Sequence, residues 1–287
     1  MITTMKQNLI YAVCVVLFFA CSCSKDNNNP DSNTINYRLV KKTFDNGKLE
    51  NYYYLENGLL RQITVSGEGS REFIYDSENK LTKVIIETLS KNYSEKYFYD
   101  DELISFIIFS LDSDKGLSDT VFFKYDNENR ISQIVKPGPH GSNKNTLVDF
   151  LYDNENRLIE STSTISVGNL TFADVIEYLW NSVGNILEAK RTFFFNDEQT
   201  SVVQVNYDYD SFLNYNSTIT YPEAYILRKK YLQTINEEFS KNNIVERKQS
   251  GDDGSSRYLF RVTKNENGFP TRIESDEDSF DLLYEER

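Results

Sequence analysis

The feature that most constrains this chain is an internal repeat. The string Tyr-Asp-Asn-Glu-Asn-Arg occurs twice, at Tyr125 to Arg130 and at Tyr152 to Arg157, and a near copy runs from Tyr75 to Lys80. Looser copies begin at six further positions: Tyr54, Tyr99, Trp180, Tyr209, Phe239 and Thr263. Neighbouring copies lie 21 to 30 residues apart. Periods of this size indicate one supersecondary unit that is repeated along the chain.

Each unit has the pattern of a β-hairpin. An alternating stretch, Val121, Phe123 and Tyr125, leads into the motif, and a second apolar stretch starts directly after its basic residue. In the turn, Asp126 can accept a hydrogen bond from the backbone two residues on, and Asn129 tolerates the left-handed conformation that closes a short hairpin loop. Glycine, which enters that conformation freely, stands at or near the Asn129 position in three other units: Gly58, Gly184 and Gly268.

The return half of each unit has an unusual spacing. Its apolar residues are three apart, as in Ile131 and Ile134 or Leu81 and Val84. Two residues three apart cannot share one face of a regular strand. Each return strand is therefore expected to carry a bulge or to be covered on both faces.

The whole repeat predicts an all-β fold. The copies of the motif imply roughly 16 to 18 strands of about 5 to 10 residues, joined through neighbours in sequence. Because so wide a twisted sheet curls, we predict an antiparallel up-and-down meander of repeated hairpins, curled into an open or closed barrel-like sheet. Tyr221 to Ile235 interrupts the rhythm and begins with Pro222. One short helix near 222–230, or a long excursion, is predicted there.

The connections between hairpins are longer and more polar than the turns within them. They are Ser66 to Arg71, Asp112 to Asp119, Lys136 to Asn145, Ser166 to Asp174 and Gly251 to Ser256. We therefore expect short turns at one end of the sheet and long loops at the other. Such loops are places where binding residues collect.

The N-terminus has the pattern of an export signal. Lys6 precedes an apolar run from Leu9 to Ala20, which is too short to span a membrane and has the length of a signal-peptide core. The run ends in Ala20-Cys21-Ser22-Cys23, which resembles the bacterial lipoprotein signal, whose cysteine is acylated after cleavage. A plain secreted protein and a retained core helix are the alternatives.

We predict Cys23 as the lipid attachment residue. Ser22 is a suitable preceding residue, and cleavage there leaves no unmodified cysteine in the mature chain, whereas Cys21 is the second choice. The predicted organisation is a lipoprotein signal peptide over 1–22, the lipidated cysteine and a polar tether over 23–35, and a single repeat β domain over 36–287. No linker composition divides the repeat region.

The charge narrows the choice of partners. The formal net charge is −13, and removing residues 1–22 deletes only the positive charge of Lys6, which leaves −14. An acidic surface without basic clusters argues against nucleic acid or anionic lipid as the main partner. The membrane contact that we expect is the lipid anchor.

Residues for catalysis or metal binding are scarce. His140 is the one histidine and stands in a Pro/Gly-rich stretch that has the pattern of a solvated loop. Asp112 to Gly116 has oxygen ligands at alternate positions but lacks the third acidic residue and the distal glutamate of a calcium loop. The 44 acidic residues single out no glycosidase pair. We therefore predict no catalytic residue, no cofactor and no metal site.

The aromatic residues of the motif favour a structural role. Tyr75, Tyr125, Tyr152 and Trp180 occupy the same repeat position, where aromatic pairs across strands stabilise neighbouring hairpins. Trp180 is thus expected to substitute for tyrosine rather than to form a sugar platform.

The repeats and the N-terminus together resemble a known group. Tyr-Asp hairpins behind Cys23-Ser24-Lys25-Asp26 look like Bacteroidetes lipoproteins of unknown function that carry YD-like repeats and are described as having a porin-like fold. The segments Phe239 to Asn243 and Lys264 to Ile273 carry the closest likeness, and RHS/YD repeats are a more distant one. The resemblance spans most of Asn36 to Arg287. It implies a lipid-anchored position at the outer membrane, facing the cell surface, and supplies no activity.

Three functions remain as hypotheses. The first is a lipid-anchored outer-membrane or cell-surface module without catalytic activity, which binds an unknown protein or saccharide through its long loops or one sheet face. The second is an extracytoplasmic, carboxylate-based enzyme that acts on glycans, and the third is a structural wall or shell component. Paired carboxylates with raised pKa values would favour the enzyme. A flat or hollow face with an apolar rim would favour binding.

A barrel that spans the membrane with its strands is disfavoured by the strand composition. A lipid-facing wall needs a continuous apolar girdle. The expected outward positions include Lys124, Gln133, Asp149 and Glu160. Polar residues thus recur on both faces of the strands.

Overall fold

The computed structural model describes residues 37–111, 118–138, 144–214, 240–252, 254–276 and 279–286. These residues form nineteen strands. The first ten are β1 (Tyr37–Phe44), β2 (Leu49–Tyr54), β3 (Leu60–Val65), β4 (Gly69–Tyr75), β5 (Leu81–Thr88), β6 (Asn92–Asp100), β7 (Leu103–Leu111), β8 (Ser118–Tyr125), β9 (Ile131–Pro137) and β10 (Lys144–Tyr152). The others are β11 (Leu158–Val167), β12 (Leu170–Trp180), β13 (Ile186–Phe195), β14 (Glu198–Leu213), β15 (Asn242–Gly251), β16 (Gly254–Leu259), β17 (Arg261–Lys264), β18 (Pro270–Glu274) and β19 (Ser279–Glu286).

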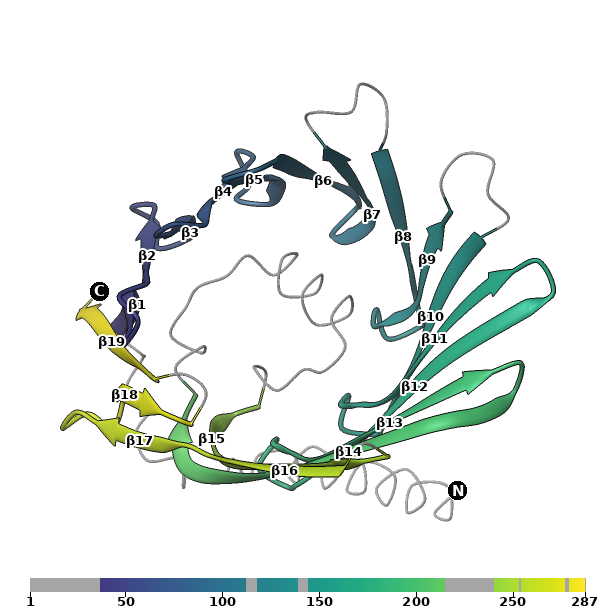
Figure 1. Ribbon diagram of the computed structural model, residues 1–287. Coiled ribbons are helices and arrows are strands. Elements are labelled where there is room, and N and C mark those ends of the chain that lie inside the picture. Colours follow the sequence, from purple (N-terminus) through teal and green to yellow (C-terminus); the bar gives the residue numbers. More distant parts are fainter. Residues whose placement is uncertain are drawn as a thin grey trace, which may run out of the picture. The chain divides into compact units, whose positions relative to one another are not determined.

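The strands form a meander that nearly closes on itself (Figure 1). Each strand from β1 to β16 pairs antiparallel with its neighbours in sequence, as do β17, β18 and β19. The last strand, β19, pairs with β1. Within the described residues no ladder joins β15 to β17, so the barrel has one unsealed seam there. This confirms the predicted all-β meander. The helix predicted near 222–230 lies outside the described residues, which contain no helix.

The turns have the predicted geometry. Asn129 has a φ of 60°, and its counterparts Asn79 and Asn156 have φ values of 67° and 62°. The Asp126 carboxylate accepts hydrogen bonds from the backbone N–H groups of Glu128 at 2.9 Å and Arg130 at 3.0 Å. The side chain of the motif's aspartate therefore holds the turn, and the asparagine reverses the chain.

The spacing of three in the return strands arises from a bulge, as expected. Lys124 pairs with Gln133 but Tyr125 pairs with Ile131, which leaves Ser132 as an extra residue. Because of this bulge, Ile131 and Ile134 are both only 1% exposed. The same register shift occurs in the other motif hairpins.

The prediction of long loops is wrong for three of the five connections. The strands continue through them: β3 and β4 are joined by a tight turn at 66–68 and β11 and β12 by one at 168–169, and β15 ends at Gly251 while β16 begins at Gly254. These residues are polar because water reaches the strand ends, not because the chain leaves the sheet. The other two connections lie partly outside the described residues.

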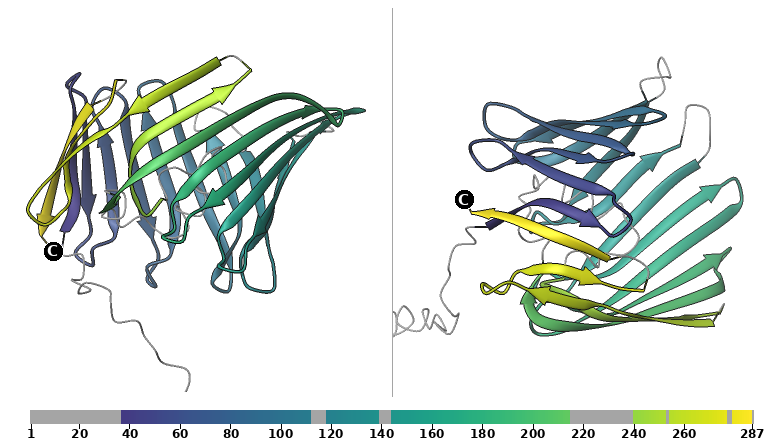
Figure 2. Two further views of the ribbon diagram at one scale, coloured as in Figure 1. Left: turned by 90° about the horizontal axis from the view of Figure 1, so that it is seen from below. Right: turned by 60° about the vertical axis from the view of Figure 1, so that its left-hand side comes forward.

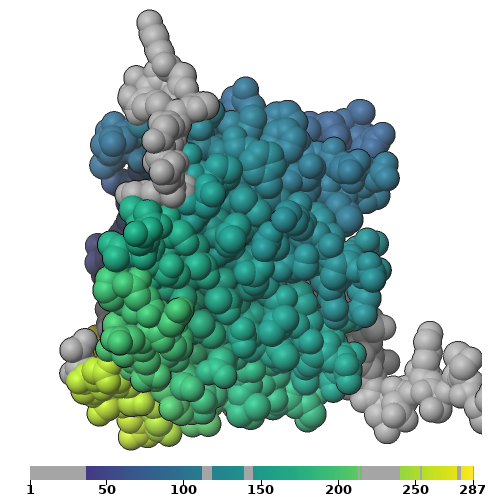
Figure 3. Space-filling view, turned by 90° about the vertical axis from the view of Figure 1, so that its right-hand side faces the viewer, coloured from purple at the N-terminus to yellow at the C-terminus, as the bar shows by residue number. Residues whose placement is uncertain are grey.

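The strands differ greatly in length, and this difference creates the candidate site. Strands β11 to β14 have 10, 11, 10 and 16 residues. In Figure 2, these green strands reach beyond the ends of the blue strands. From outside, the teal and green strands form a closely packed wall (Figure 3).

One face of the sheet carries the buried core. Along β6, for example, Tyr97 is 4% exposed while the next residue, Phe98, is 38% exposed. We call the face that includes Tyr97 the core face and the other the opposite face. The core positions recur in every motif hairpin, so the core is one continuous cluster around the barrel.

Candidate functional site: an apolar cup on the long hairpins

The residues considered for chemistry from the sequence lie outside the described residues. They are Cys21, Cys23, His140 and the segment from Asp112 to Gly116. In the described ranges, no three His, Cys, Asp or Glu side chains are grouped so that they could hold a metal ion. Nor does a helix in this part of the chain have the length and apolarity to cross a membrane.

In seven copies of the motif, the aromatic residue bonds across the gap between two hairpins. The Tyr152 hydroxyl donates a hydrogen bond to the carbonyl of Ile131 at 2.7 Å. The backbone ladder between β9 and β10 ends at the pair Gln133–Asp149, before it reaches Ile131. The Tyr152 hydroxyl therefore supplies the hydrogen bond that a backbone N–H of β10 would otherwise donate to the Ile131 carbonyl. Six further pairs repeat this contact: Tyr54–Leu39, Tyr75–Leu60, Tyr99–Leu81, Tyr125–Ile104, Trp180–Leu158 and Tyr209–Ile186.

Trp180 makes this contact with its indole nitrogen, at 2.7 Å from the Leu158 oxygen. It therefore takes the position of a tyrosine, as expected. Burial raises the pKa of Tyr75, which keeps its hydroxyl protonated as a donor. These rings belong to the fold and are not available as a ligand platform.

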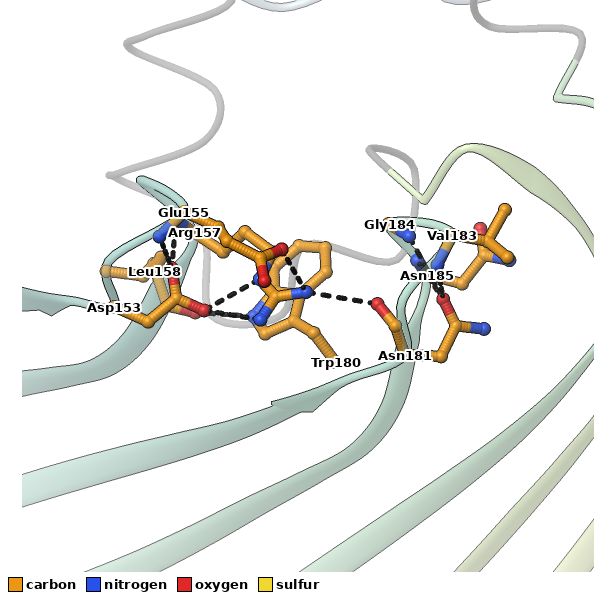
Figure 4. A network of polar contacts seen from close by, with 9 residues as sticks. All are labelled: Asp153, Glu155, Arg157, Leu158, Trp180, Asn181, Val183, Gly184 and Asn185. Atoms are coloured by element: carbon orange, nitrogen blue, oxygen red, sulfur yellow. Dashed lines mark hydrogen bonds and ion pairs between the residues drawn. The ribbon is translucent and has the colours of Figure 1, made fainter. Parts of the chain in front are cut away.

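The turns are also tied to one another (Figure 4). Arg157 donates to the carboxylate of its own turn, Asp153, at 2.7 Å, and to the carbonyl of Asn181 in the next turn at 3.1 Å. Arg130 donates to the side-chain Oδ1 of Asn156 in the next turn at 2.8 Å. The basic residue of the motif thus links adjacent hairpins, and the repeated residues of the motif are accounted for by structure.

The seam between β15 and β17 is bridged by side chains. The last backbone bond across it runs from the N–H of Phe260 to the carbonyl of Val245, at 2.9 Å. Beyond this point Lys264 forms an ion pair with Asp210 of β14 at 2.9 Å and lies 3.2 Å from the centroid of the Phe212 ring. Side-chain contacts therefore replace a ladder there.

A buried asparagine pair fixes the start of β15 beside this seam. Asn185 and Asn242 are 3% and 5% exposed and exchange two hydrogen bonds of 2.9 Å. Asn242 also donates to the carbonyl of Phe212 at 2.9 Å. Because buried amides need partners, this network specifies where β15 begins.

An apolar cavity of about 610 Å³ lies on the long hairpins. We call it the cup and define it by Ile165, Phe172, Phe193 and Phe195, with Ser163 and Ser201 at its edge. Ile165 pairs with Phe172, and Phe172 pairs with Phe195, so one row of the core face crosses three strands. This row lies beyond the buried core positions of the same strands, such as Tyr178 of β12.

The rings of the cup are exposed. Phe172 and Phe195 are 44% and 38% exposed, and their centroids are 5.1 Å apart. Full burial of a phenylalanine side chain contributes about 1.5 to 3 kcal/mol, so part of this free energy is not gained within the chain. A cluster of exposed apolar side chains with a polar edge is typical of an interaction site.

A charged pair forms the inner edge of the cup. Arg191 donates two hydrogen bonds to the Asp174 carboxylate, at 2.8 and 2.6 Å, and its guanidinium stacks on the Phe193 ring at 4.4 Å. Such bidentate pairing neutralises both groups and holds Phe193 in place. The pair therefore positions the cup and leaves it without a strong charge of its own.

A second, more polar cavity of about 350 Å³ adjoins the cup. Its lining includes Gln249, Asp252, Ser255 and Ser256, and it shares Phe193 and Ser201 with the cup. The Asp252 carboxylate accepts a hydrogen bond from the N–H of Val202 at 3.2 Å, through Oδ2. We call this space the polar cavity.

The opposite face has a different character. Lys124 donates to Gln133 at 2.8 Å, and Gln133 donates to Asp149 at 2.7 Å, so polar ladders cross the strands there. An aromatic row, Phe98 to Phe106, is stacked at 4.4 Å. Neither cavity described above includes these residues.

The carboxyl groups of the described residues whose pKa values are displaced all have lowered values. Hydrogen bonds from Lys248 and then Arg257 lower the pKa of Glu246 to about 2. The pKa of Asp126 is lowered mainly by the hydrogen bond from the backbone N–H of Arg130 and further by the Arg130 guanidinium. Carboxylates held ionised in this way are poor general acids. A glycan-acting enzyme would be favoured by two neighbouring carboxyl groups with raised pKa values. Among the described residues, no displaced carboxyl pKa is a raised one.

The cup was not predicted from the sequence. The one available signal was the run Phe193-Phe194-Phe195, which stands outside the repeated motif and before the turn at Asn196. Phe172 and Ile165 gave no signal, because alternating apolar residues are equally typical of a covered strand.

No family model and no curated protein matches this chain. Among solved structures, a porin-like protein from Bacteroides vulgatus is similar, with 14% identity and a TM-score of 0.43 over 86% of this chain and 98% of that one. A porin-like protein from Bacteroides uniformis has 9% identity and a TM-score of 0.46 over 87% of this chain and 97% of that one. A chain of the Photorhabdus luminescens Tc holotoxin pore has 11% identity and a TM-score of 0.38, over 80% of this chain and 12% of that one. Scores of this size carry neither a family nor a function to this chain, so the resemblance to YD-repeat lipoproteins stays an expectation.

Proposed function

We propose that this protein is a lipid-anchored binding module of the outer membrane, exposed at the cell surface, that has no catalytic activity and binds its ligand in the cup. The observation that carries the proposal is the cavity of about 610 Å³. Its volume is in the range of small-molecule and side-chain binding pockets. Its rings take no part in the contacts that hold the repeats together.

The anchor is supported by the sequence. The apolar run from Leu9 to Ala20 is followed by Cys21 and Cys23, and the segment behind them is polar. A lipid on Cys23 would tether the β domain to a membrane surface. The polar ladder from Lys124 to Asp149 on the opposite face supports a domain surrounded by water rather than lipid.

The sequence offers two candidate binding surfaces, the long loops and one sheet face. The geometry favours the sheet face as the binding surface. The strands continue through three of the expected loops, whereas the cup is a hollow with an apolar floor and a hydroxyl edge formed by Ser163 and Ser201. A protein or saccharide partner remains compatible with this surface, and nucleic acid is disfavoured by the net charge of −13.

The proposal is tested by comparing ligand binding of the wild type with that of a variant in which the cup is altered. The double variant Phe172→Ser, Phe195→Ser removes both exposed rings, and Phe122→Ser on the opposite face, at 42% exposure, is the matched control. Wild type, variant and control are screened against a phage-displayed library of random dodecapeptides and a printed glycan array. We expect binding by wild type and control that the double variant loses, with all three melting at similar temperatures.

Two results would contradict the proposal. One is binding that persists undiminished in the double variant, which would place the binding surface elsewhere. The other is turnover of a glycan on the array that a single carboxylate substitution abolishes, which would favour the enzyme.

A further inference from the structure

We propose that the cup and the polar cavity together take a segment of another protein in which apolar side chains stand next to a lysine or arginine. This inference rests on the proposed binding function and names the class of ligand. It follows from the adjacency of the two cavities, the apolar character of one, and the sign of the charge at the other.

The two cavities form one elongated site. Phe193 and Ser201 line both of them, so the cup of about 610 Å³ and the polar cavity of about 350 Å³ lie side by side within reach of one extended ligand. A polypeptide segment presents side chains of different character at neighbouring positions. It can therefore place an apolar group in one cavity and a polar group in the other.

The larger cavity fits an apolar side chain. Phe172 and Phe195 are tilted by 44° at 5.1 Å, and Ile165 lies beside Phe172 across the strand pair. Tilted rings at this distance leave their edges and faces open to a further aromatic or aliphatic group. A saccharide would find hydrogen-bond partners only at the hydroxyl edge of the cup, so its apolar walls favour an apolar side chain.

The smaller cavity fits a cation. Asp252 is exposed and uses only Oδ2 in its hydrogen bond to Val202, while the other lining side chains named here, Gln249, Ser255 and Ser256, are neutral. Asp174, the carboxylate at the cup, is already neutralised by Arg191. The carboxylate of Asp252 therefore gives the site a net negative charge.

The charge of the whole chain selects against other occupants. At a net charge of −13, a second copy of this chain, an anionic lipid surface and a nucleic acid would all be repelled. A segment with a positive charge would instead be attracted over a distance, which raises its rate of association.

The dodecapeptide library tests the ligand class directly. Phage are depleted on the immobilised Phe172→Ser, Phe195→Ser variant and then selected on the wild-type β domain with its tether, Ser24 to Arg287. We expect enriched peptides to combine two or more large apolar residues with a net positive charge. The best peptide is then synthesised in two forms, one with its basic residues and one with glutamate in their place, and both are measured by calorimetry.

The expected results separate the two parts of the site. The basic peptide should bind at least about tenfold more tightly than its acidic form. Phe172→Ser should weaken both peptides, whereas Asp252→Asn should reduce the preference for the basic form and Phe122→Ser should change neither. Melting temperatures of all variants serve as the fold control.

Other outcomes overturn the inference in distinguishable ways. Enrichment of acidic or neutral peptides, equal affinity of the two synthetic forms, or no enrichment over the double variant would reject the ligand class. A glycan that binds wild type but not the double variant would reject it as well and would leave the binding function of the cup intact.

Discussion

The ammonium group of Lys264 and the carboxylate of Asp210 meet at 2.9 Å beside the seam between β15 and β17, where the described residues form no backbone ladder. Their side chains are only 20% and 12% exposed. Asp210 also accepts a hydrogen bond from the N–H of Phe212 at 2.9 Å, so its carboxylate is held in position. A partly buried, hydrogen-bonded pair contributes more than a surface ion pair. The closure of the barrel thus depends on a contact between side chains.

Lys264→Met should loosen the seam. The substitution keeps the length of the side chain but leaves the Asp210 carboxylate without its cation, which costs about 1 to 3 kcal/mol. Chemical unfolding measures this loss. Amide hydrogen exchange should increase in β15 and β17 more than in β5 and β6.

Lys190→Met is the matched control for the seam. Lys190 forms an ion pair with Glu177 at 3.1 Å, but the two side chains are 44% and 52% exposed. Exposed pairs contribute about 0 to 1 kcal/mol. If both substitutions have the same effect on stability and exchange, the seam contact has no special role.

Tyr152→Phe should destabilise the protein by about 1 to 2 kcal/mol, because it leaves the carbonyl of Ile131 without its donor. Tyr53→Phe is the control, since Tyr53 is 48% exposed on the opposite face and should change stability by less than about 0.5 kcal/mol. Thermal unfolding compares the two. Equal effects would mean that the repeated hydroxyl contact does not hold the hairpins together.

Substitutions at Asn129 test the turn. Its φ of 60° is open to glycine and costly for a β-branched residue. Asn129→Gly should be neutral or slightly stabilising, and Asn129→Val should cost about 1 to 2 kcal/mol. Melting temperatures that coincide for the two variants would contradict the role of this position.

Acid should weaken the contribution of Glu246. Hydrogen bonds from Lys248 and Arg257 lower its pKa from 4.5 to about 2, so the ionised form is favoured in the folded state. A lowered folded-state pKa adds stability above the unfolded pKa, and this stability is lost as the pH falls toward the folded value. The stability difference between wild type and Glu246→Gln should therefore shrink between pH 6 and pH 2. Denaturant midpoints across that range measure it, and a difference that does not vary with pH would count against the ion pair.

Cys23→Ser should abolish lipidation. Metabolic labelling with an alkyne fatty acid is expected to mark the wild type, and the variant should lose both the label and its membrane association. Cys21→Ser is the control and should keep both. The reverse pattern would make Cys21 the attachment residue.

The repeated motif made the hairpins predictable because its contacts are local. Asp126 binds backbone groups two and four residues ahead, Asn129 reverses the chain in the same turn, and the bulge at Ser132 follows within a few residues. Even the contact from Tyr152 to Ile131 spans only 21 residues, less than one repeat. Interactions of this range are encoded in every copy, so repetition in the sequence becomes repetition in space.

The closure and the cup were decided by tertiary structure, because both depend on residues far apart or on coverage by neighbours. Tyr37 pairs with Glu286 only because the accumulated twist and curl of the sheet bring its first and last strands together. The phenylalanines of the cup are apolar and alternate like those of the core, so the sequence does not distinguish Phe172 from Tyr178. What distinguishes them is position: Tyr178 is 7% exposed within the continuous core, whereas Phe172 is 44% exposed farther along the same strand, beyond the core positions. Exposure depends on how the whole sheet folds around each position, and the sequence of a single strand does not carry that information.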